Sequence, residues 1–305
     1  MAITAGQVKE LRDKTGAGLL DCQNALKETN GNVAEAEKIL RKKGLADAAK
    51  KAGRVAADGL IGYRIEGGTA ALIELNCETD FVAKTDDFRK ARQLLSDAVF
   101  AHGALGDAPS LDVEKVKALK APAGLPGATG TVADWLKVYT AKTGENTQLR
   151  RAARVVAAPG GQLTLYAHTG DRNVVVLETA ACDETLAKDL AMQVAALAPQ
   201  YATRDAVPAK VLEEEREIAR AKAAAAGKPA NVVEKMVEGM VNKWFGEAVL
   251  VDQPFVKDDK KKVSQVVAER GGPGARIVRF VRLKVGEGVE RKATDLAADV
   301  AALMK

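Results

Sequence analysis

The chain has 305 residues, of which 47% are hydrophobic and 29% charged, and its formal net charge at pH 7 is +5. This length is enough for two or three domains, and the mild positive charge permits an acidic partner without requiring one. Apolar runs are too short to span a bilayer, and the first residues lack the apolar stretch of a secretory signal. We therefore expect a cytoplasmic protein that does not bind a membrane.

Residue types that carry common enzyme chemistry are scarce. The three cysteines, Cys22, Cys77 and Cys182, are far apart without CxxC spacing, which favours reduced thiols over disulfides or a zinc site. The chain has only two histidines, His102 and His168, and aromatic residues make up 4% of it, too few for a row of stacking platforms. We therefore predict no catalytic residues, no metal, no cofactor and no direct binding of nucleic acid.

Three short helices are predicted in residues 1–46. Capping boxes start the first and third helices at Thr4 and Asn32, and the second helix spans about residues 19–28. The third helix ends in the basic stretch 41–44, where cations suit the C-terminal end of a helix. Three helices of this size form only a marginal bundle by themselves, and such modules commonly serve as docking domains.

Two adjacent leucines in the second helix are candidates for the docking surface. The helical pattern turns Leu19 inward together with Cys22, Ala25 and Leu26. Neighbouring side chains on a helix are separated by about 100°, so Leu20 is then free to be exposed. The alternative is that both leucines belong to the core.

The order strand, turn, strand, polar link and helix occurs twice in the chain. In the first copy, strands at 60–65 and 70–75 precede a helix, and in the second, strands at 163–168 and 174–178 do so. Apolar residues alternate in these strands, which predicts one apolar face for each. A hairpin is too small to be stable without cover, so we predict two related subdomains of antiparallel sheets with covering helices.

Two helices of similar length, at about 209–226 and 231–244, predict an antiparallel hairpin. A strand at 277–284 and a helix at 294–304 follow it. The predicted fold class is therefore α+β. The predicted divisions are a three-helix docking domain (1–46), a helical connector (47–58), core subdomain 1 (59–141) with a Gly- and Pro-rich surface insertion (101–131) without assigned function, core subdomain 2 (142–198 and 244–284), a protruding helical hairpin (199–243) and a C-terminal module (285–305).

The stretch ETDFVAK at 78–84 places a large aromatic residue on a polar connector that leaves a sheet. Connectors lie at the surface, where binding residues collect, so Phe81 is a candidate contact residue. The alternative is that Thr79 caps the next helix while Phe81 packs beneath it, since buried phenylalanine is the rule.

Short motifs along the chain carry a family resemblance. They are, in order, LRDKTGAGLLDC at 11–22, ETDFVAK at 78–84, KTGEN at 142–146, EKMVEG at 234–239, DQPFV at 252–256 and VGEGVE at 285–290. Together they resemble the elongation factor Ts family over about residues 1–100 and 142–305. That family usually has methionine where this chain has Leu19 and Leu20, and phenylalanine at the place of Leu296.

The resemblance implies a guanine-nucleotide exchange factor in translation elongation, which is not an enzyme. Such a factor binds elongation factor Tu carrying GDP and promotes GDP release, so that GTP can rebind. The resemblance also implies that the helical hairpin is a dimerisation arm. The assembly would then be a homodimer or a heterotetramer with elongation factor Tu, and the sequence leaves the oligomeric state open.

The resemblance gives the 78–84 stretch the central role in exchange. Thr79, Asp80, Phe81 and Val82 would insert into the GTPase, with the phenylalanine as a wedge beside its switch region. This insertion would disturb the bound magnesium ion and the nucleotide phosphates.

Two further contacts follow from the same resemblance. The N-terminal bundle is expected to be ubiquitin-associated-like, and Arg12, Leu19 and Leu20 would dock it on the nucleotide-binding domain of the GTPase. His168 would contact the distal domain of the GTPase, although a lone surface histidine by itself indicates little.

Two other functional classes remain open from the residues alone. A basic protein associated with RNA or the ribosome would bind in a manner that falls steeply with salt and needs no GTPase. An enzyme would use Asp80 or Glu78 as a general base, but the sequence has no phosphate loop, metal cluster or nucleophile–base pairing to support this.

Overall fold

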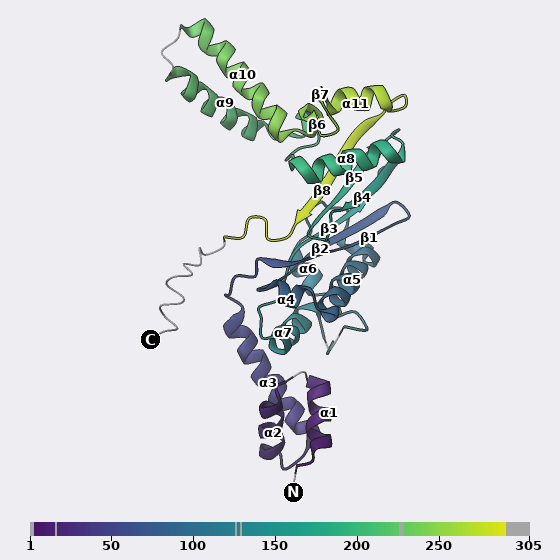
Figure 1. The fold of residues 1–305 in the computed structure, drawn as a ribbon, viewed down its shortest axis with the longest axis vertical. Helices are drawn as coiled ribbons and strands as arrows, with labels where there is room; N and C mark the ends of the chain where they lie inside the picture. Colours follow the sequence, from purple (N-terminus) through teal and green to yellow (C-terminus); the bar gives the residue numbers. More distant parts are fainter. Residues whose placement is uncertain (1–2, 16, 126, 129, 226–228, 291–305) are drawn as a thin grey trace.

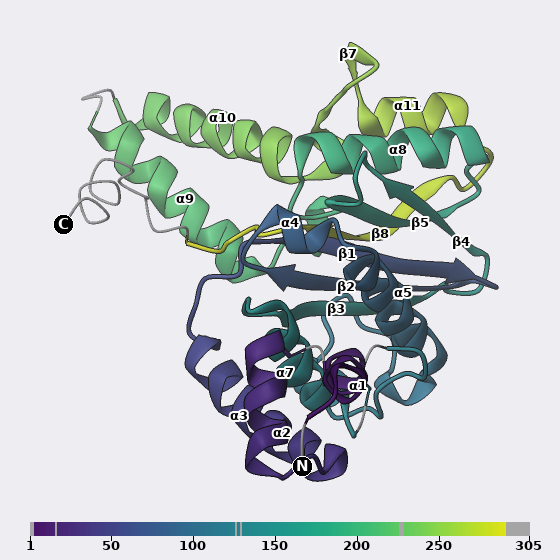
Figure 2. The ribbon, with the colours of Figure 1, turned by 60° about the horizontal axis from the view of Figure 1, so that its bottom comes forward.

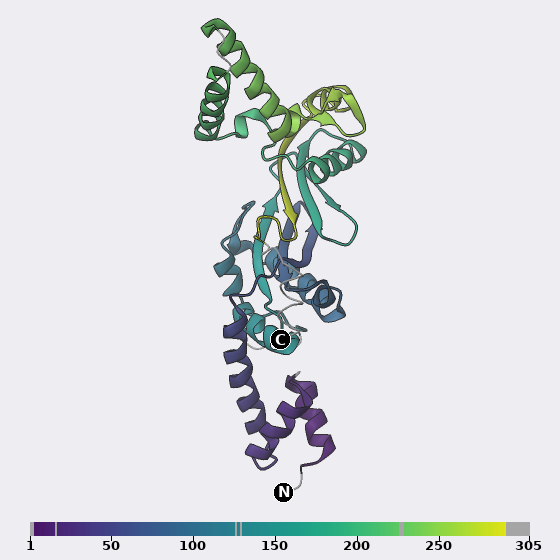
Figure 3. The ribbon, with the colours of Figure 1, turned by 60° about the vertical axis from the view of Figure 1, so that its left-hand side comes forward.

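The computed structural model has a mixed α+β fold, which confirms the predicted class (Figure 1). It describes residues 3–15, 17–125, 127–128, 130–225 and 229–290. A bundle of N-terminal helices and a projecting helical hairpin lie at opposite ends of the molecule, with the sheets between them (Figures 1 and 3). The predicted C-terminal helix at 294–304, including Leu296, lies outside the described residues.

The N-terminal bundle packs around buried apolar side chains that include Leu11, Cys22 and Leu26. Its helices are α1 (Ala5–Thr15), α2 (Leu19–Glu28) and α3 (Val33–Lys51). Side-chain caps fix two of the starts, as predicted: the Thr4 hydroxyl accepts a hydrogen bond in the first turn of α1, and the Asn32 side chain accepts two in the first turn of α3.

Helix α3 is longer than the sequence predicted. It continues to Lys51 through Gly44, whereas the prediction ended the helix at 41–44 and began a separate connector at residue 47. The reason is a close crossing with α7 (Val132–Thr143), because a Cβ at position 44 would lie 3.0 Å from the Ala141 Cβ. Gly44 therefore serves the packing of two helices and does not end one.

Two three-stranded antiparallel sheets form the centre, and both predicted hairpins are confirmed within them. The first sheet has the order β1 (Asp58–Glu66), β2 (Thr69–Cys77) and β3 (Gln148–Val156), and the second has the order β4 (Gly161–Ala167), β5 (Asn173–Ala180) and β8 (Arg276–Lys284).

Strand β3 was not predicted, and it crosses the predicted division of the core. The prediction assigned residues 142–198 to the second subdomain, but β3 pairs with β2 of the first sheet. Its sequence, QLRRAARVV, carries three arginines and shows only a weak alternation. The alternation of residues within one strand does not show which other strand it pairs with, so the pairing of β3 with β2 was not evident from the sequence.

The two sheets pack face to face, so the core has four layers. Leu72 and Ala153 of the first sheet share a buried cluster with Val176 and Val281 of the second. Their neighbours along the strands, such as Ile73, point outward to the covering helices. Figure 2 shows the second sheet between α8 (Glu184–Leu197) and the first sheet. The prediction of a single apolar face is therefore wrong for the central strands β2 and β5, which are buried on both faces.

The outer layers consist of helices and, on the first sheet, part of the insertion at 101–131. The remaining helices of these layers are α5 (Asp86–Ala101), α6 (Val113–Lys117) and α11 (Val263–Arg270). Leu111, Val116 and Leu125 of the insertion are buried beside α5 and α7. The Leu111 N–H donates to the Ala152 carbonyl of β3 over 2.8 Å. The predicted surface loop is thus partly core, and it covers the outer edge of β3, which would otherwise be open to pairing.

The helical hairpin is formed as predicted and projects from the second sheet (Figures 1 and 2). It has a small apolar core of its own, which includes Ala223, Val241 and Phe245. The two helices of the hairpin are α9 (Ala209–Ala224) and α10 (Ala230–Ala248). The connection back to β8 contains the short strands β6 (Pro254–Phe255) and β7 (Asp258–Lys262). Short 3-10 helices are found at Gly103–Leu105, Arg204–Ala206 and Leu250–Asp252.

A buried carboxylate ties the segment after β8 to the first sheet. Glu74 on β2 is fully buried and accepts hydrogen bonds from Arg150 and Arg151 of β3, the latter over 2.5 Å. It also accepts from the Gly286 N–H over 2.8 Å. Gly286 has a φ of +70°, and a Cβ there would lie 2.3 Å from the Ala57 carbonyl oxygen, so only glycine fits. The VGEGVE motif therefore has a structural role in joining the two sheets.

We predict that Glu74→Gln lowers the free energy of unfolding by about 3 kcal/mol, because it leaves two arginines without their buried counter-charge. Urea denaturation followed by circular dichroism measures this change. Glu66→Gln is the matched control, since the Glu66–Arg64 pair is exposed and is expected to contribute less than about 1 kcal/mol. Equal effects of the two substitutions would contradict the assignment.

Candidate partner-binding site

An exposed phenylalanine stands on a one-turn helix directly after β2. This helix, α4 (Asp80–Ala83), begins at Thr79, whose hydroxyl accepts a hydrogen bond from the Val82 N–H. The Phe81 side chain is 79% exposed, whereas Ala83 beneath it is buried. The alternative that Phe81 packs under the following helix is therefore wrong. Phe88, in the first turn of α5, is the buried phenylalanine here.

The base of α4 is held by the KTGEN stretch at 142–146. The Glu145 carboxylate accepts hydrogen bonds from the Thr79 N–H over 3.0 Å and from the Thr79 hydroxyl over 2.6 Å. One residue further on, the Asn146 N–H donates to the Glu78 carboxylate over 2.7 Å. Two motifs far apart in the sequence therefore form one structural unit, which we call the brace (Glu78, Thr79, Glu145 and Asn146).

The brace also reaches the end of the N-terminal helices. The Asn146 side-chain amide donates to the backbone carbonyls of Ala52 and Arg54, over 3.2 and 2.7 Å. Ala52 follows the last residue of α3. The Arg54 guanidinium lies 3.6 Å from the Glu78 carboxylate, which adds a partly exposed ion pair to the same point. Asn146 is itself buried, so it fixes both the connector and the start of α4 from inside.

The ionisable groups beside Phe81 are an exposed ion pair and a buried thiol. Asp80 forms an exposed ion pair with Lys84 over 2.5 Å, and this hydrogen bond holds the pKa of Asp80 below its ordinary value. Cys77 is the buried last residue of β2, and its thiol donates a hydrogen bond to the Thr79 carbonyl. Burial raises the pKa of the Cys77 thiol to about 12, so it stays protonated and is a poor nucleophile.

The candidate docking residues of the bundle are all exposed. Leu19 is 55% and Leu20 is 72% exposed, and Arg12 lies on the surface of α1. The prediction that Leu19 faces the core is therefore wrong. Leu19 is the first residue of α2, and the buried residues of this helix are Cys22, Ala25 and Leu26. The two leucines together form an apolar patch that has no cover within the described chain.

His168 is exposed at the end of β4, in the turn that leads to β5. Its Nδ1 lies 3.0 Å from the Tyr166 hydroxyl, and its N–H donates to the Asn173 carbonyl. The same turn is fastened to strand β1 of the first sheet by Asp171, whose carboxylate accepts from the Tyr63 hydroxyl over 3.2 Å and whose backbone carbonyl accepts from the Ile61 N–H over 2.8 Å. The Asp171 carboxylate also accepts from Arg92 of α5 over 2.6 Å. His168 therefore has a fixed position, and Asp171 is the residue that sequence reasoning missed here.

The sequence-predicted residues form three separate surface regions. Thr79 to Val82 lie together on α4, Arg12 and the two leucines lie on the bundle, and His168 lies on the second sheet. The 78–84 and 142–146 motifs were both evident in the sequence, but nothing in either motif indicated that Glu145 would accept hydrogen bonds from Thr79.

Two kinds of site are not found in the described part of the chain. Among those residues, no group of three or more His, Cys, Asp or Glu side chains is placed to hold a metal ion. None of the helices described is both long and apolar enough to cross a bilayer.

Comparison with known proteins gives one consistent family. The family profile described as Elongation factor TS matches residues 78–287, which include the brace, strand β3 and the whole of the second sheet. Proteins named Elongation factor Ts from Methylococcus capsulatus and Thioalkalivibrio sulfidiphilus are 44% and 43% identical to this chain over 307 residues, and each alignment covers 100% of this chain and 99% of the relative. Another from Nitratiruptor sp. is 42% identical over 318 residues, with both chains fully covered. This chain therefore belongs to the elongation factor Ts family, whose members act in translation elongation.

Proposed function

We propose that the chain is a guanine-nucleotide exchange factor for elongation factor Tu. It binds the GTPase with GDP bound, disturbs the sites of the magnesium ion and the phosphates, and promotes GDP release so that GTP can rebind. The observation that carries this proposal is the exposed Phe81 on a braced one-turn helix, in a chain of this family. No covalent step is needed, because the factor acts only through binding.

In this proposal Phe81 is the wedge, and the residues beside it present it. Thr79 holds the start of α4, while Asp80 and Val82 flank the wedge and contact the GTPase. A phenylalanine that is 79% exposed has most of its surface left to bury in a partner. Such burial contributes roughly 1.5 to 3 kcal/mol.

A wedge of this strength is not enough by itself. Moving a two-state equilibrium from 1:99 to 99:1 requires about 5.5 kcal/mol of differential binding. We therefore assign the remainder to a broad interface that favours the nucleotide-free GTPase. Arg12, Leu19 and Leu20 dock the bundle on the nucleotide-binding domain, and His168 contacts the distal domain. Linkage makes the effect reciprocal, so GDP weakens the binding of the factor as much as the factor weakens the binding of GDP.

The hairpin α9–α10 is proposed as a dimerisation arm. It projects away from both sheets, and Ile218 on α9 is 47% exposed. Pairing of two such arms would give a homodimer, or a heterotetramer with two copies of the GTPase. Sedimentation of the chain alone and with elongation factor Tu separates these assemblies by mass.

The direct test is stopped-flow release of a fluorescent GDP from elongation factor Tu, with and without the unmutated chain. We expect the release rate to rise with factor concentration and to reach a plateau. A release rate that does not change when the chain is added would overturn the proposed function.

We predict that Phe81→Ala lowers the plateau rate of GDP release by about 10- to 100-fold, because 1.5 to 3 kcal/mol of differential binding is lost. The fold is expected to remain intact, since the side chain is exposed. Leu197→Ala is the matched control, an exposed apolar truncation at the end of α8 outside the proposed contact surfaces, and is expected to leave the plateau unchanged. A wild-type plateau for Phe81→Ala would reject the wedge.

We predict a different signature for Leu20→Ala in the same assay. Its effect falls on docking, so the half-saturating factor concentration rises about tenfold while the plateau changes little. Leu20→Met retains the apolar area and serves as the control, with near-normal half-saturation. A fall in plateau without a shift in half-saturation would show that Leu20 acts elsewhere.

We predict that Glu145→Ala lowers the plateau only through Phe81, because Glu145 holds Thr79 and is not expected to touch the partner. Glu145→Ala in the Phe81→Ala background is therefore expected to add little, as coupled residues are not additive. Glu145→Gln retains one acceptor oxygen and should be intermediate. Full additivity of the two alanine substitutions would contradict the positioning role without affecting the case for the wedge.

A further inference from the structure

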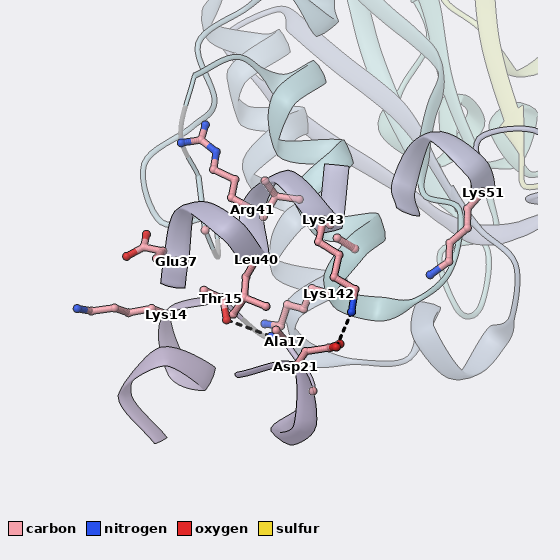
Figure 4. A pocket seen from close by; sticks show the side chains of 15 residues that line it. Lys14, Thr15, Ala17, Asp21, Glu37, Leu40, Arg41, Lys43, Lys51 and Lys142 are labelled. Carbon is pink, nitrogen blue, oxygen red and sulfur yellow. Dashed lines mark hydrogen bonds and ion pairs between the residues drawn. The ribbon is translucent and has the colours of Figure 1, made fainter. Parts of the chain in front are cut away.

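A cavity of about 250 Å³ lies between the N-terminal bundle and α7 (Figure 4). Its apolar walls come from the α1–α2 junction, α3 and α7, and they are Ala17, Leu40, Val138 and Ala141. Leu40 also belongs to the core of the bundle, whereas Val138 and Ala141 are only half-buried. The cavity therefore has apolar surface that the described part of the chain leaves uncovered.

The charged groups at the rim of this cavity are mostly paired. Lys43 pairs with Asp21 over 2.6 Å, and Lys142 pairs with Asp87 over 2.7 Å. In Figure 4 the side chain of Lys14 is directed away from the cavity. The surface that remains to be covered is thus chiefly apolar.

The size of the cavity favours side chains inserted from outside over a separate ligand. Pockets for small molecules usually have volumes of roughly 300–1,000 Å³. Gly44 and Gly127 leave this smaller space open, because a Cβ on them would lie 3.0 Å from the Ala141 Cβ and 3.2 Å from the Val138 side chain. Such a space between helices accepts the side chains of a third helix, as knobs enter holes in helix packing.

A segment of this chain supplies a helix with the required apolar face. Residues 291–305 lie outside the described part of the chain. Their sequence predicts an amphipathic helix at 294–304, in which Leu296, Val300 and Leu303 have the spacing of one face. A short helix of this kind is stable only when its apolar face is covered.

The described chain leads toward this cavity. Gly286 packs against the carbonyl of Ala57, which follows Lys51 of the cavity wall by six positions. A chain spans at most about 3.6 Å per residue, so Gly286 lies within about 27 Å of Lys51. The ten positions from Gly286 to Leu296 span up to about 36 Å. Leu296 is therefore able to reach the cavity.

We propose that residues 294–304 dock on this cavity as a helix, with Leu296, Val300 and Leu303 turned toward α3 and α7. The short link to Gly286 gives the segment a high effective concentration, so a modest apolar contact is enough to hold it. A second copy of the chain or a separate protein lacks this advantage. The docked helix covers Val138 and fastens the bundle to the core, and this contact does not depend on the proposed exchange activity.

Photo-crosslinking of the full chain by itself tests the contact. Ala297, beside the proposed apolar face, is replaced by benzoylphenylalanine, and the irradiated protein is digested and analysed by mass spectrometry. We expect cross-links from this position to peptides that carry Leu40 or Val138. Mixing isotope-labelled and unlabelled chains separates cross-links within one chain from those between two copies.

Two substitutions in this background give matched arms. Leu296→Asp is expected to lower the yield of these cross-links about tenfold, because it places a carboxylate against apolar walls. Ala298→Asp adds the same charge on the opposite face of the predicted helix, and it is expected to change the yield little. Val138→Asp is expected to reproduce the loss from the α7 side, and thermal unfolding establishes that each variant is folded.

Three results would overturn the proposed docking. The first is the absence of cross-links between position 297 and the cavity peptides, and the second is cross-links found only between labelled and unlabelled chains. The third is an equal loss of yield with Leu296→Asp and Ala298→Asp. GDP release is not the readout, so any of these results leaves the proposed exchange function unaffected.

Discussion

The face-to-face packing of the two sheets is the constraint from which the rest of the structure follows. It buries β2 and β5 on both faces, so the strands themselves have no free apolar surface to offer a partner. The contact residues proposed on the core accordingly lie where the chain leaves the sheets, at the end of β2 and in the β4–β5 turn. Glu74 joins the segment after β8 to the first sheet, and Asp171 joins the β4–β5 turn to β1. A buried carboxylate is costly unless it is fully paired, which explains why arginines surround Glu74.

The brace has a separate role, which is to hold in place the short helix that carries the exposed side chain of Phe81. A four-residue helix is not stable by itself, because the first helical turn fixes several dihedral angles for a single hydrogen bond. If α4 were free, the partner would have to order it, and that ordering would subtract from the 1.5 to 3 kcal/mol that one phenylalanine contributes. The two hydrogen bonds from Thr79 to Glu145 order α4 in advance. Glu145 therefore preorganises α4.

Local signals in the sequence predicted what depends on local physics. Capping at Thr4 and Asn32 and the two hairpins were accessible in this way, whereas the local pattern left open whether Phe81 is exposed or packed beneath the next helix. The failures arose where tertiary contacts decide the outcome. Gly44 has the composition of a helix end but sits in a helix crossing, and Leu19 satisfies the helical period but stands at the exposed first position of α2. The hydrogen bond between Thr79 and Glu145 joins residues that are 66 positions apart in the sequence, and no periodic pattern predicts a contact over such a distance.

The position of Asn146 gives the brace a consequence beyond α4. Through its side chain and its N–H, this one buried residue is bonded to the connector that follows α3 and to Glu78 that precedes α4. A hydrogen bond of this kind contributes only about 0.5 to 1.5 kcal/mol, so no single bond fixes the bundle on the core. The hydrogen bonds of Asn146 act together with the close packing of α3 on α7 at Gly44. The bundle that carries Leu19 and Leu20 and the helix that carries Phe81 are therefore both fastened at Asn146, so a shift of the bundle on α7 would change the distance between these two proposed contact surfaces. Geometry at this junction, more than the composition of either surface, then sets how well both contacts are made at once.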